Sequence, residues 1–240
     1  MRTPLITLVA LAAIVCATLA PPHVRATPRA IDPPQAFVAV APFRALWVSD
    51  DLTVVIKQGP GYGIWLSRSD QEAGSVVVRE EQGVLRLSKN PRLQPGQTPA
   101  TITISAPSLG HLLVNKTATV RSEQLTQQQP LYIDAGGGAT VQLNLSVPLL
   151  VVEAMGQPKL KLSGSAEKVE VQAAGTGLVE AQQLKVAQWF LDLSNRVQVS
   201  VAATLLLDAD LRDDAQLSYR GKPTTLRVRP SGNARVVQTS

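Results

Sequence analysis

The sequence predicts an all-β protein in which paired N-terminal strands precede a short right-handed single-stranded β-helix or β-roll. Three observations support this prediction. Short β-branched segments with alternating polarity, separated by turn residues, fill the chain from about residue 46 onward. Helical patterns are nearly absent, and a motif recurs every 19 residues in the second half. A repeat of about 20 residues that consists of strands is typical of a coil that stacks on itself.

The composition predicts a folded domain and argues against several classes of protein. The chain has 240 residues, of which 45% are hydrophobic, 17% charged and 4% aromatic, so a core can be buried. Two histidines and one cysteine leave little material for metal or thiol chemistry. The formal net charge of +5 is too mild to indicate nucleic-acid binding. We therefore expect no catalytic, cofactor-binding or metal-binding residue, no cofactor and no nucleic-acid partner.

Residues 1–26 have the pattern of an export signal peptide. Arg2 precedes an apolar stretch from Leu5 to Ala20, which is short for a membrane span of about 20 residues. Val24 and Ala26 are the small residues that a signal peptidase prefers, so we expect cleavage after Ala26. The mature chain is then expected to have no transmembrane segment and to be periplasmic, outer-membrane-associated or extracellular.

Two alternative fates of the N-terminus stay open. Lipoprotein processing at Cys16 would attach a lipid, although Val15 stands where the processing enzymes prefer Gly, Ala or Ser. An uncleaved signal would instead anchor the chain in a membrane. The sequence leaves open whether Cys16 is lipidated.

A leader at 27–40, which contains several prolines, is expected to be extended and to lead into one β domain at 41–240. Within that domain we expect paired strands over 41–108, β-helical rungs over 109–223 and edge strands over 224–240. Gly59–Gly63 lacks the spacing of a phosphate-binding loop and is interpreted as a hairpin turn. Gln182–Phe190 has a weak helical pattern and is interpreted as a strand and its connection.

Three copies of the repeat start at Ile133, Val152 and Val171. In each copy Ala follows after two residues, Gly after four and an aliphatic residue after eight. Inward aliphatic residues of such a coil contact their equivalents about 4.8 Å along the axis, and Gly permits the positive φ of a sharp turn. The register extends to Val114 and Ala118 before these copies and, with altered spacing, to Leu191–Asn195 and Leu207–Leu211 after them. A β-sandwich with accidental periodicity stays open as the alternative.

Several segments carry a resemblance to a known family. They are Pro42-Phe43 followed by Leu46–Val48, then Leu52–Gly59, Gln82–Leu87 and, most specifically, Leu217–Pro223 followed by Ser231–Val236. Through these segments the chain, from about Ala41 to Gln238, resembles the head GIN domain of putative auto-transporter adhesins. The resemblance implies an exported bacterial protein with a β-helix or β-roll after paired strands, and it implies no catalytic or binding residue. The Ser-Gly-Ala turns of the family are replaced here by Gly136–Gly138, Met155–Gln157 and Ser194–Asn195.

A few side chains could carry chemistry. Once the signal peptide is removed, His111 has no second histidine or cysteine as co-ligand, and it is interpreted as a loop or strand-start residue rather than a general base. Stacking would bring Asp134 beside Glu153, which is the carboxylate pair that a carbohydrate-active β-helix enzyme would use. The four carboxylates that would be tested as ligands of a cation such as Ca²⁺ are Asp208, Asp210, Asp213 and Asp214.

The segment after Tyr219 is basic. It contains no acidic residue and has cations at Arg220, Lys222, Arg227, Arg229 and Arg235. Such a segment either contacts an anionic surface or keeps a sheet edge soluble, and we favour the second interpretation.

These observations favour an exported, non-catalytic surface or envelope protein. Its regular faces are expected to bind another macromolecule or a glycan at the cell envelope, in an adhesion-like manner. A carbohydrate-active enzyme and a purely structural periplasmic scaffold stay open as alternatives. The oligomeric state and the identity of the partner are not predicted.

Overall fold

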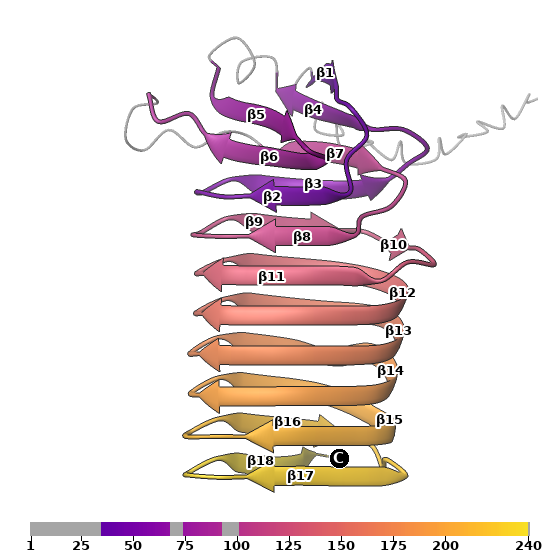
Figure 1. Ribbon diagram of the computed structural model, residues 1–240, viewed down its shortest axis with the longest axis vertical. Coiled ribbons are helices and arrows are strands. Elements are labelled where there is room, and N and C mark those ends of the chain that lie inside the picture. The colour runs from indigo at the N-terminus through magenta and orange to yellow at the C-terminus, as the bar shows by residue number, and fades with distance from the viewer. Residues whose placement is uncertain (1–34, 68–73, 93–100, 240) are drawn as a thin grey trace, which may run out of the picture. The chain divides into compact units, whose positions relative to one another are not determined.

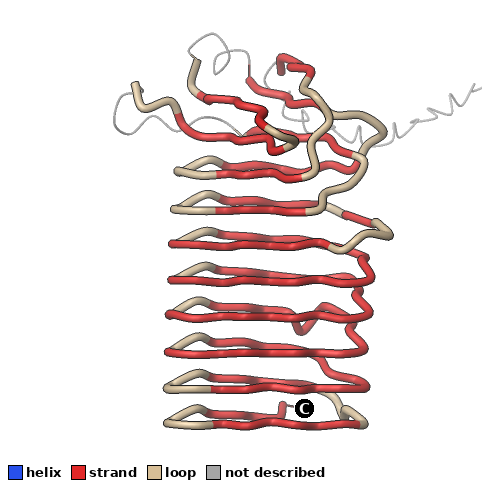
Figure 2. Tube along the Cα trace, viewed as in Figure 1, coloured by secondary structure: helices blue, strands red, loops and turns tan. Residues whose placement is uncertain are grey.

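The structure is a computed structural model that describes residues 35–67, 74–92 and 101–239. Within these residues all regular elements are strands, and Figure 2 shows only strands and loops. No helix among the described residues is long and apolar enough to cross a membrane. The predicted signal peptide at 1–26, including Cys16, lies outside the described residues, as does the leader before residue 35.

The described part of the chain contains 18 strands. They are β1 (Gln35–Ala39), β2 (Ala45–Val48), β3 (Thr53–Gln58), β4 (Gly63–Ser67), β5 (Val76–Glu81), β6 (Val84–Lys89), β7 (Ile102–Ala106), β8 (His111–Val114), β9 (Thr119–Ser122), β10 (Leu125–Thr126), β11 (Leu131–Gly137), β12 (Thr140–Gly156), β13 (Lys159–Gly175), β14 (Leu178–Asn195), β15 (Gln198–Leu211), β16 (Gln216–Arg220), β17 (Thr225–Pro230) and β18 (Arg235–Thr239).

From β8 onward the chain winds as a right-handed β-helix, which confirms the predicted fold class (Figure 1). Each full turn of this coil is called a rung. A rung runs along the front face, formed by β8, β11, β17 and the second halves of β12 to β15. It returns along the back face, formed by β9, β16, β18 and the first halves of β12 to β15. Neighbouring rungs pair in parallel, which excludes the β-sandwich alternative.

The predicted columns of aliphatic residues are present. Ile133 pairs with Val152, and Val152 pairs with Val171. Leu191 and Ala209 continue this column in the next two rungs. All five side chains are at most 4% exposed, so they form one continuous part of the core. The segment 182–190 is strand within β14, as interpreted from the sequence.

The register before the first repeat differs from the prediction by two residues. Val114 pairs with Ala135 rather than with Ile133, whose partner is Leu112. Ala118 accordingly lies beside Ala139, and this rung has 21 residues instead of 19. One extra residue lies between β9 and β10, and the other lies after β10, in the loop that carries the buried side chain of Gln127. An insertion at a corner leaves the stacking of the flat faces unchanged.

Parallel stacking begins ahead of the predicted start at residue 109. The pair β2–β3 lies between β6–β7 on one side and β8–β9 on the other, and all of these contacts are parallel. Short alternating strands have the same sequence pattern in a hairpin and in a rung, so the pattern alone could not separate the two. At the other end, β17 and β18 form the last rung of the stack.

The N-terminal end of the coil is covered by antiparallel strands. β1 pairs with β4, β4 pairs with β7, and β5 pairs with β6. Because β3 and β4 both pair with β7, the segment Gly59–Gly63 is a connection that passes β7. The prediction of a hairpin turn there was wrong, since the same turn residues also suit a connection between strands that do not pair.

One corner of the coil is a column of residues with positive φ. Its members from the repeats are Gly137, Gly156, Gly175 and Asn195, and the same corner position is held by Asp50, Lys116, Asp213 and Gly232 in other rungs. The turn from the front to the back face therefore has a positive φ at the same position in successive rungs. This uniform corner fixes the register with which side chains align on the faces.

Candidate functional site

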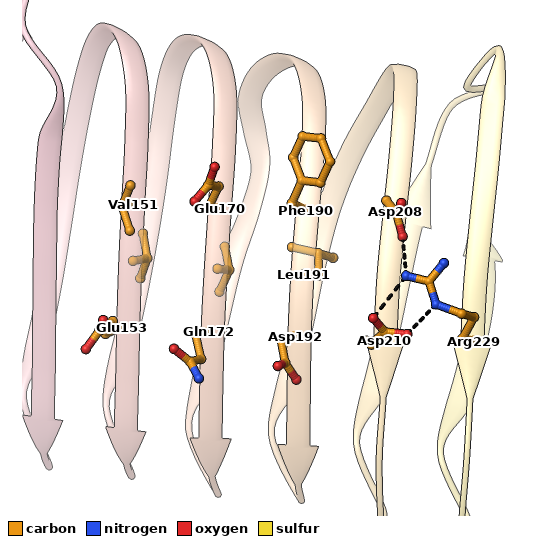
Figure 3. Close-up of a pocket in the computed structure, with 12 residues that line it drawn as sticks. Val151, Glu153, Glu170, Gln172, Phe190, Leu191, Asp192, Asp208, Asp210 and Arg229 are labelled. Atoms are coloured by element: carbon orange, nitrogen blue, oxygen red, sulfur yellow. Dashed lines mark hydrogen bonds and ion pairs between the residues drawn. The ribbon is translucent and has the colours of Figure 1, made fainter.

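A groove on the front face, with a volume of about 520 Å³, is the candidate site. It crosses β12 to β15 and reaches β17, and we call it the front-face groove. Figure 3 shows its side chains arranged as two columns that follow the coil axis. One column contains Val151, Glu170, Phe190 and Asp208, and the other contains Glu153, Gln172, Asp192, Asp210 and Arg229.

The alternation of each strand places these residues outside the coil. Val152, Val171 and Leu191 point into the core, so the residues on either side of them point outward. Because equivalent positions of successive rungs are about 4.8 Å apart, the outward side chains form a regular ladder. The groove is thus a direct product of the repeat that builds the core.

An ion-pair network closes the C-terminal end of the groove. Arg229 donates from Nε to Asp210 Oδ1 at 2.5 Å and from its Nη2 to Asp208 Oδ1 at 2.6 Å (Figure 3). The hydrogen bond from Arg229 lowers the pKa of Asp210, and the hydrogen bonds to Asp210 and Asp208 raise the pKa of Arg229. Asp210 and Arg229 are therefore both charged at neutral pH.

The middle of the groove contains further charged pairs and an aromatic ring. Glu170 pairs with Lys168, whose ammonium lies 4.7 Å from the centre of the Phe190 ring. Asp192 accepts a hydrogen bond from Arg212, and this bond raises the pKa of Arg212. Cations thus flank the acidic side chains and hold them and the ring in place.

Glu153 and Gln172 are the groove residues available for a ligand. Both side chains are exposed, and neither has a hydrogen-bond or ion-pair partner among the described residues. They occupy adjacent positions of one column. Together they offer a carboxylate acceptor next to an amide that both donates and accepts.

The predicted neighbours Asp134 and Glu153 do lie side by side, since β11 and β12 pair them directly. Asp134 is occupied by His111, whose Nε2 lies 2.8 Å from Asp134 Oδ2. His111 is the first residue of β8, and its ring meets the edge of Tyr132 with the ring centres 6.0 Å apart. The two carboxylates therefore have different surroundings, one paired with a histidine and one free.

The four carboxylates considered as cation ligands do not form one cluster. Asp208 and Asp210 face the groove and bind Arg229, whereas Asp213 and Asp214 lie in the corner turn. Asp213 accepts a hydrogen bond from the backbone N–H of Asn195 at 3.0 Å. In the part of the chain that the structure describes, no group of three or more His, Cys, Asp or Glu side chains could hold a metal ion.

The basic residues near the C-terminus are distributed over several surfaces. Arg227 and Arg229 are on the front face, and Arg235 is on the back face. Arg220 donates from its Nη2 to the carbonyl of Gln182 at 3.1 Å. They therefore lie on both faces of the last rungs rather than on one face.

Four residues of the groove were not predicted from the sequence as site residues: Glu170, Gln172, Phe190 and Asp192. The available signal was the repeat register, which aligns Glu153, Gln172 and Asp192 at one position of successive rungs. Following that register outward from the core positions would have identified the column.

The fold and the groove together define a class of protein: an all-β, right-handed β-helical protein with a ligand-accessible ladder of polar side chains on one face. Residues 42–223 match the family described as putative auto-transporter adhesin, head GIN domain, and the chain belongs to that family. No curated protein is significantly similar to the chain.

Solved structures of similar fold include proteins from Bacteroides and Parabacteroides species. A putative adhesin from Bacteroides fragilis is 21% identical with a TM-score of 0.73, over 85% of this chain and 96% of its own. A putative adhesin from Parabacteroides distasonis is 15% identical with a TM-score of 0.66, over 86% and 96%. A putative lipid binding protein from the same species is 12% identical with a TM-score of 0.63, over 87% and 97%. At these identities the likeness establishes the fold alone.

Proposed function

We propose that this protein is an exported, non-catalytic adhesion module of the cell envelope that binds an extended, uncharged glycan along the front-face groove. The observation that carries the proposal is the ladder of free polar groups beside an aromatic ring, with Glu153, Gln172 and Phe190 on successive rungs. Export is supported by the signal-peptide pattern of residues 1–26 and by membership of a family described as adhesins.

The chemistry of the groove suits a sugar chain. Sugar hydroxyls donate hydrogen bonds to carboxylates such as that of Glu153. They both donate to and accept from amides such as that of Gln172. The C–H face of a sugar ring can pack against the half-buried ring of Phe190 and the half-buried aliphatic side chain of Val151. Because these groups repeat along the coil axis, an extended chain of similar units fits better than a compact molecule.

The charge of the groove selects against anionic glycans. Five of its lining residues are acidic and only Arg229 among them is basic. Uronic acids, sulfates or phosphates would meet the unpaired carboxylate of Glu153 at close range, where like charges repel. An uncharged glycan avoids this cost.

A binding role agrees better with the groove than hydrolysis does. Glycosidases need one carboxyl group protonated as a general acid and a second one as base or nucleophile. Here Arg229 lowers the pKa of Asp210, and Asp134 is paired with His111. Glu153 is the free carboxylate, and it has no free carboxylate in the neighbouring rungs of its column, where Asp134 and Gln172 stand.

Binding of purified protein to an array of neutral and acidic envelope polysaccharides, followed by calorimetry, tests the proposal. Phe190→Ala should weaken binding of a neutral glycan at least about tenfold, and Gln172→Ala about threefold to tenfold, since each loses a direct contact. Gln142→Ala is the matched control, because Gln142 is an exposed glutamine on the back face of β12. Its affinity should equal that of the parent protein.

Three results would contradict the proposal. In the first, Gln142→Ala and Gln172→Ala lose the same affinity for the glycan. In the second, the protein prefers acidic glycans. In the third, the parent protein releases shortened sugar products and Glu153→Gln does not. The last result would favour the carbohydrate-active enzyme instead.

A further inference from the structure

The two ends of the coil are built differently. Antiparallel strands β1, β4 and β5 cover the N-terminal end, whereas β17 and β18 form a rung with no described strand beyond it (Figure 1). The change is visible in the core column that contains Leu207 and Leu226. Leu207 is 0% exposed, while its neighbour Leu226 in the last rung is 49% exposed.

The same exposure extends across the inward positions of the last rung. Val228, Ala234 and Val236 are only partly buried, although their partners one rung earlier are at most 1% exposed. The apolar core therefore ends at a surface, which we call the terminal floor and define by Leu226, Val228, Ala234 and Val236. An uncovered core end favours occupation by another element.

The backbone of β17 offers unpaired hydrogen-bonding groups at this end. Ser231 donates its N–H to the carbonyl of Leu211 in the rung above. In a parallel strand the N–H and C=O of one residue point to the same neighbouring strand, and those of the next residue point to the opposite side. Because Ser231 faces the rung above, the N–H and C=O groups of Leu226 and Val228 point to the open edge. Pro230 also lies at the open edge but has no N–H, so the edge that can pair ends there.

The rim of the terminal floor is cationic. Arg227, Arg229 and Arg235 are its charged side chains, and the sequence has no acidic residue after Asp214. Arg227 is 65% exposed, and its nearest carboxylate is 3.9 Å away at Asp208. Arg235 has no ion-pair partner among the described residues.

We propose that the open edge of β17 binds an acidic segment of a partner protein as an added β-strand. Aliphatic side chains of that strand cover Leu226 and Val228, its backbone pairs with theirs, and its outward carboxylates meet Arg227 and Arg229. Strand addition of this kind takes its affinity from main-chain hydrogen bonds and its specificity from alternate side chains. This surface shares Arg229 with the end of the front-face groove, but it does not depend on a glycan being bound there.

Two other occupants fit the terminal floor less well. A second copy placed by a two-fold axis would bring the arginines of one last rung against those of the other, and like charges on opposed strands are destabilising. A lipid bilayer would match the apolar floor and the cationic rim. However, it would leave the backbone groups of Leu226 and Val228 without hydrogen-bond partners in hydrocarbon, which is unfavourable.

A fluorescein-labelled peptide with the sequence Glu-Val-Glu-Ile-Glu-Val, blocked at both ends, tests the proposal by anisotropy with the full chain. The peptide with lysine in place of glutamate is the control. The acidic peptide should bind at least about tenfold more tightly, because only it complements the arginines. Arg227→Glu should abolish this preference, while Lys161→Glu, a charge reversal on the back face of β13, should leave it unchanged.

A second variant separates strand pairing from simple charge attraction. Val228→Pro removes an N–H that faces the open edge and leaves the hydrogen bonds to β15 in place. It should therefore weaken binding of the acidic peptide at least about fivefold. Equal binding of both peptides, or no effect of Arg227→Glu, would overturn the proposal. It would also be overturned by concentration-dependent dimerisation that Arg227→Glu enhances, or by binding to phosphatidylglycerol vesicles without any binding of the acidic peptide.

Discussion

Replacing Gly175 by alanine should destabilise the coil more than any other alanine substitution in the corner column of the repeats. Gly175 has φ of +112°, outside the left-handed region that other residues occasionally adopt. A Cβ atom there would also overlap the backbone carbonyl oxygen of Gly156 in the preceding rung. The backbone strain costs about 1–3 kcal/mol and the overlap a similar amount, so we expect a loss of about 2–6 kcal/mol.

The same corner supplies graded comparisons. At Gly156, φ is +94° and an added Cβ would lie 3.2 Å from the carbonyl oxygen of Gly137, so alanine should cost about 1–3 kcal/mol. Asn195 holds the equivalent position with φ of +61°, which a side chain tolerates. Asn195→Ala should therefore cost only about 1 kcal/mol.

Urea unfolding of the three variants, followed by circular dichroism and tryptophan fluorescence, measures this order. If unfolding is two-state with an unchanged m-value, the shift of the midpoint gives the change in the free energy of unfolding. The reasoning is refuted if Gly175→Ala and Asn195→Ala have the same midpoint, because the corner backbone would then not discriminate between residue types.

Three further predictions concern buried or paired polar groups. Trp189→Phe should cost about 1–3 kcal/mol in urea unfolding, because the indole N–H donates to the carbonyl of Ala202 at 2.8 Å inside the core; an unchanged midpoint would contradict this. Gln127→Leu should cost about 2–4 kcal/mol by the same assay, since its amide bonds both the N–H and the carbonyl of Leu109, and a Gln124→Leu control should not. Burial opposes ionisation of Asp50, but hydrogen bonds from Lys116 and the backbone of Lys89 outweigh the effect of burial and lower the pKa of Asp50. The contribution of Asp50 to stability is therefore present at neutral pH and is lost as the pH falls below about 4. Asp50→Asn should therefore lower the midpoint at pH 7 and approach the parent value at pH 3; a constant difference would count against the ion pair.

The fold of the second half could be predicted because each rung repeats the same physical solution. Ile133, Val152 and Val171 recur at one spacing, and the glycines four residues later mark the corner. The rung before Ile133 could not be placed correctly, because an insertion at the far corner changes the spacing without changing the pattern of either strand.

The N-terminal third was harder to predict for a different reason. β2 and β3 stack between strands that come later in the sequence, so spatial order does not follow chain order there. No local pattern records such a crossing, and Gly59–Gly63 was accordingly assigned to a hairpin. The pairing of Asp134 with Glu153 could be foreseen, since it follows from the register alone. The role of Arg229 could not, because its approach to Asp208 and Asp210 depends on the last rung continuing the stack.

Distances between spin labels on the front face test the stacked coil most directly. His111, Tyr132, Val151 and Arg227 occupy one outward column, with Arg227 four rungs from Val151, five from Tyr132 and six from His111. With Cys16 replaced by serine and one spin label fixed at residue 227, the second label is placed at residue 151, 132 or 111. Pulsed electron double resonance should then report distances that reflect backbone separations of about 19, 24 and 29 Å, rising by about 4.8 Å per rung. Separations that do not rise by equal steps, or that follow the number of intervening residues instead, would contradict the coil and the ladder of side chains that depends on it.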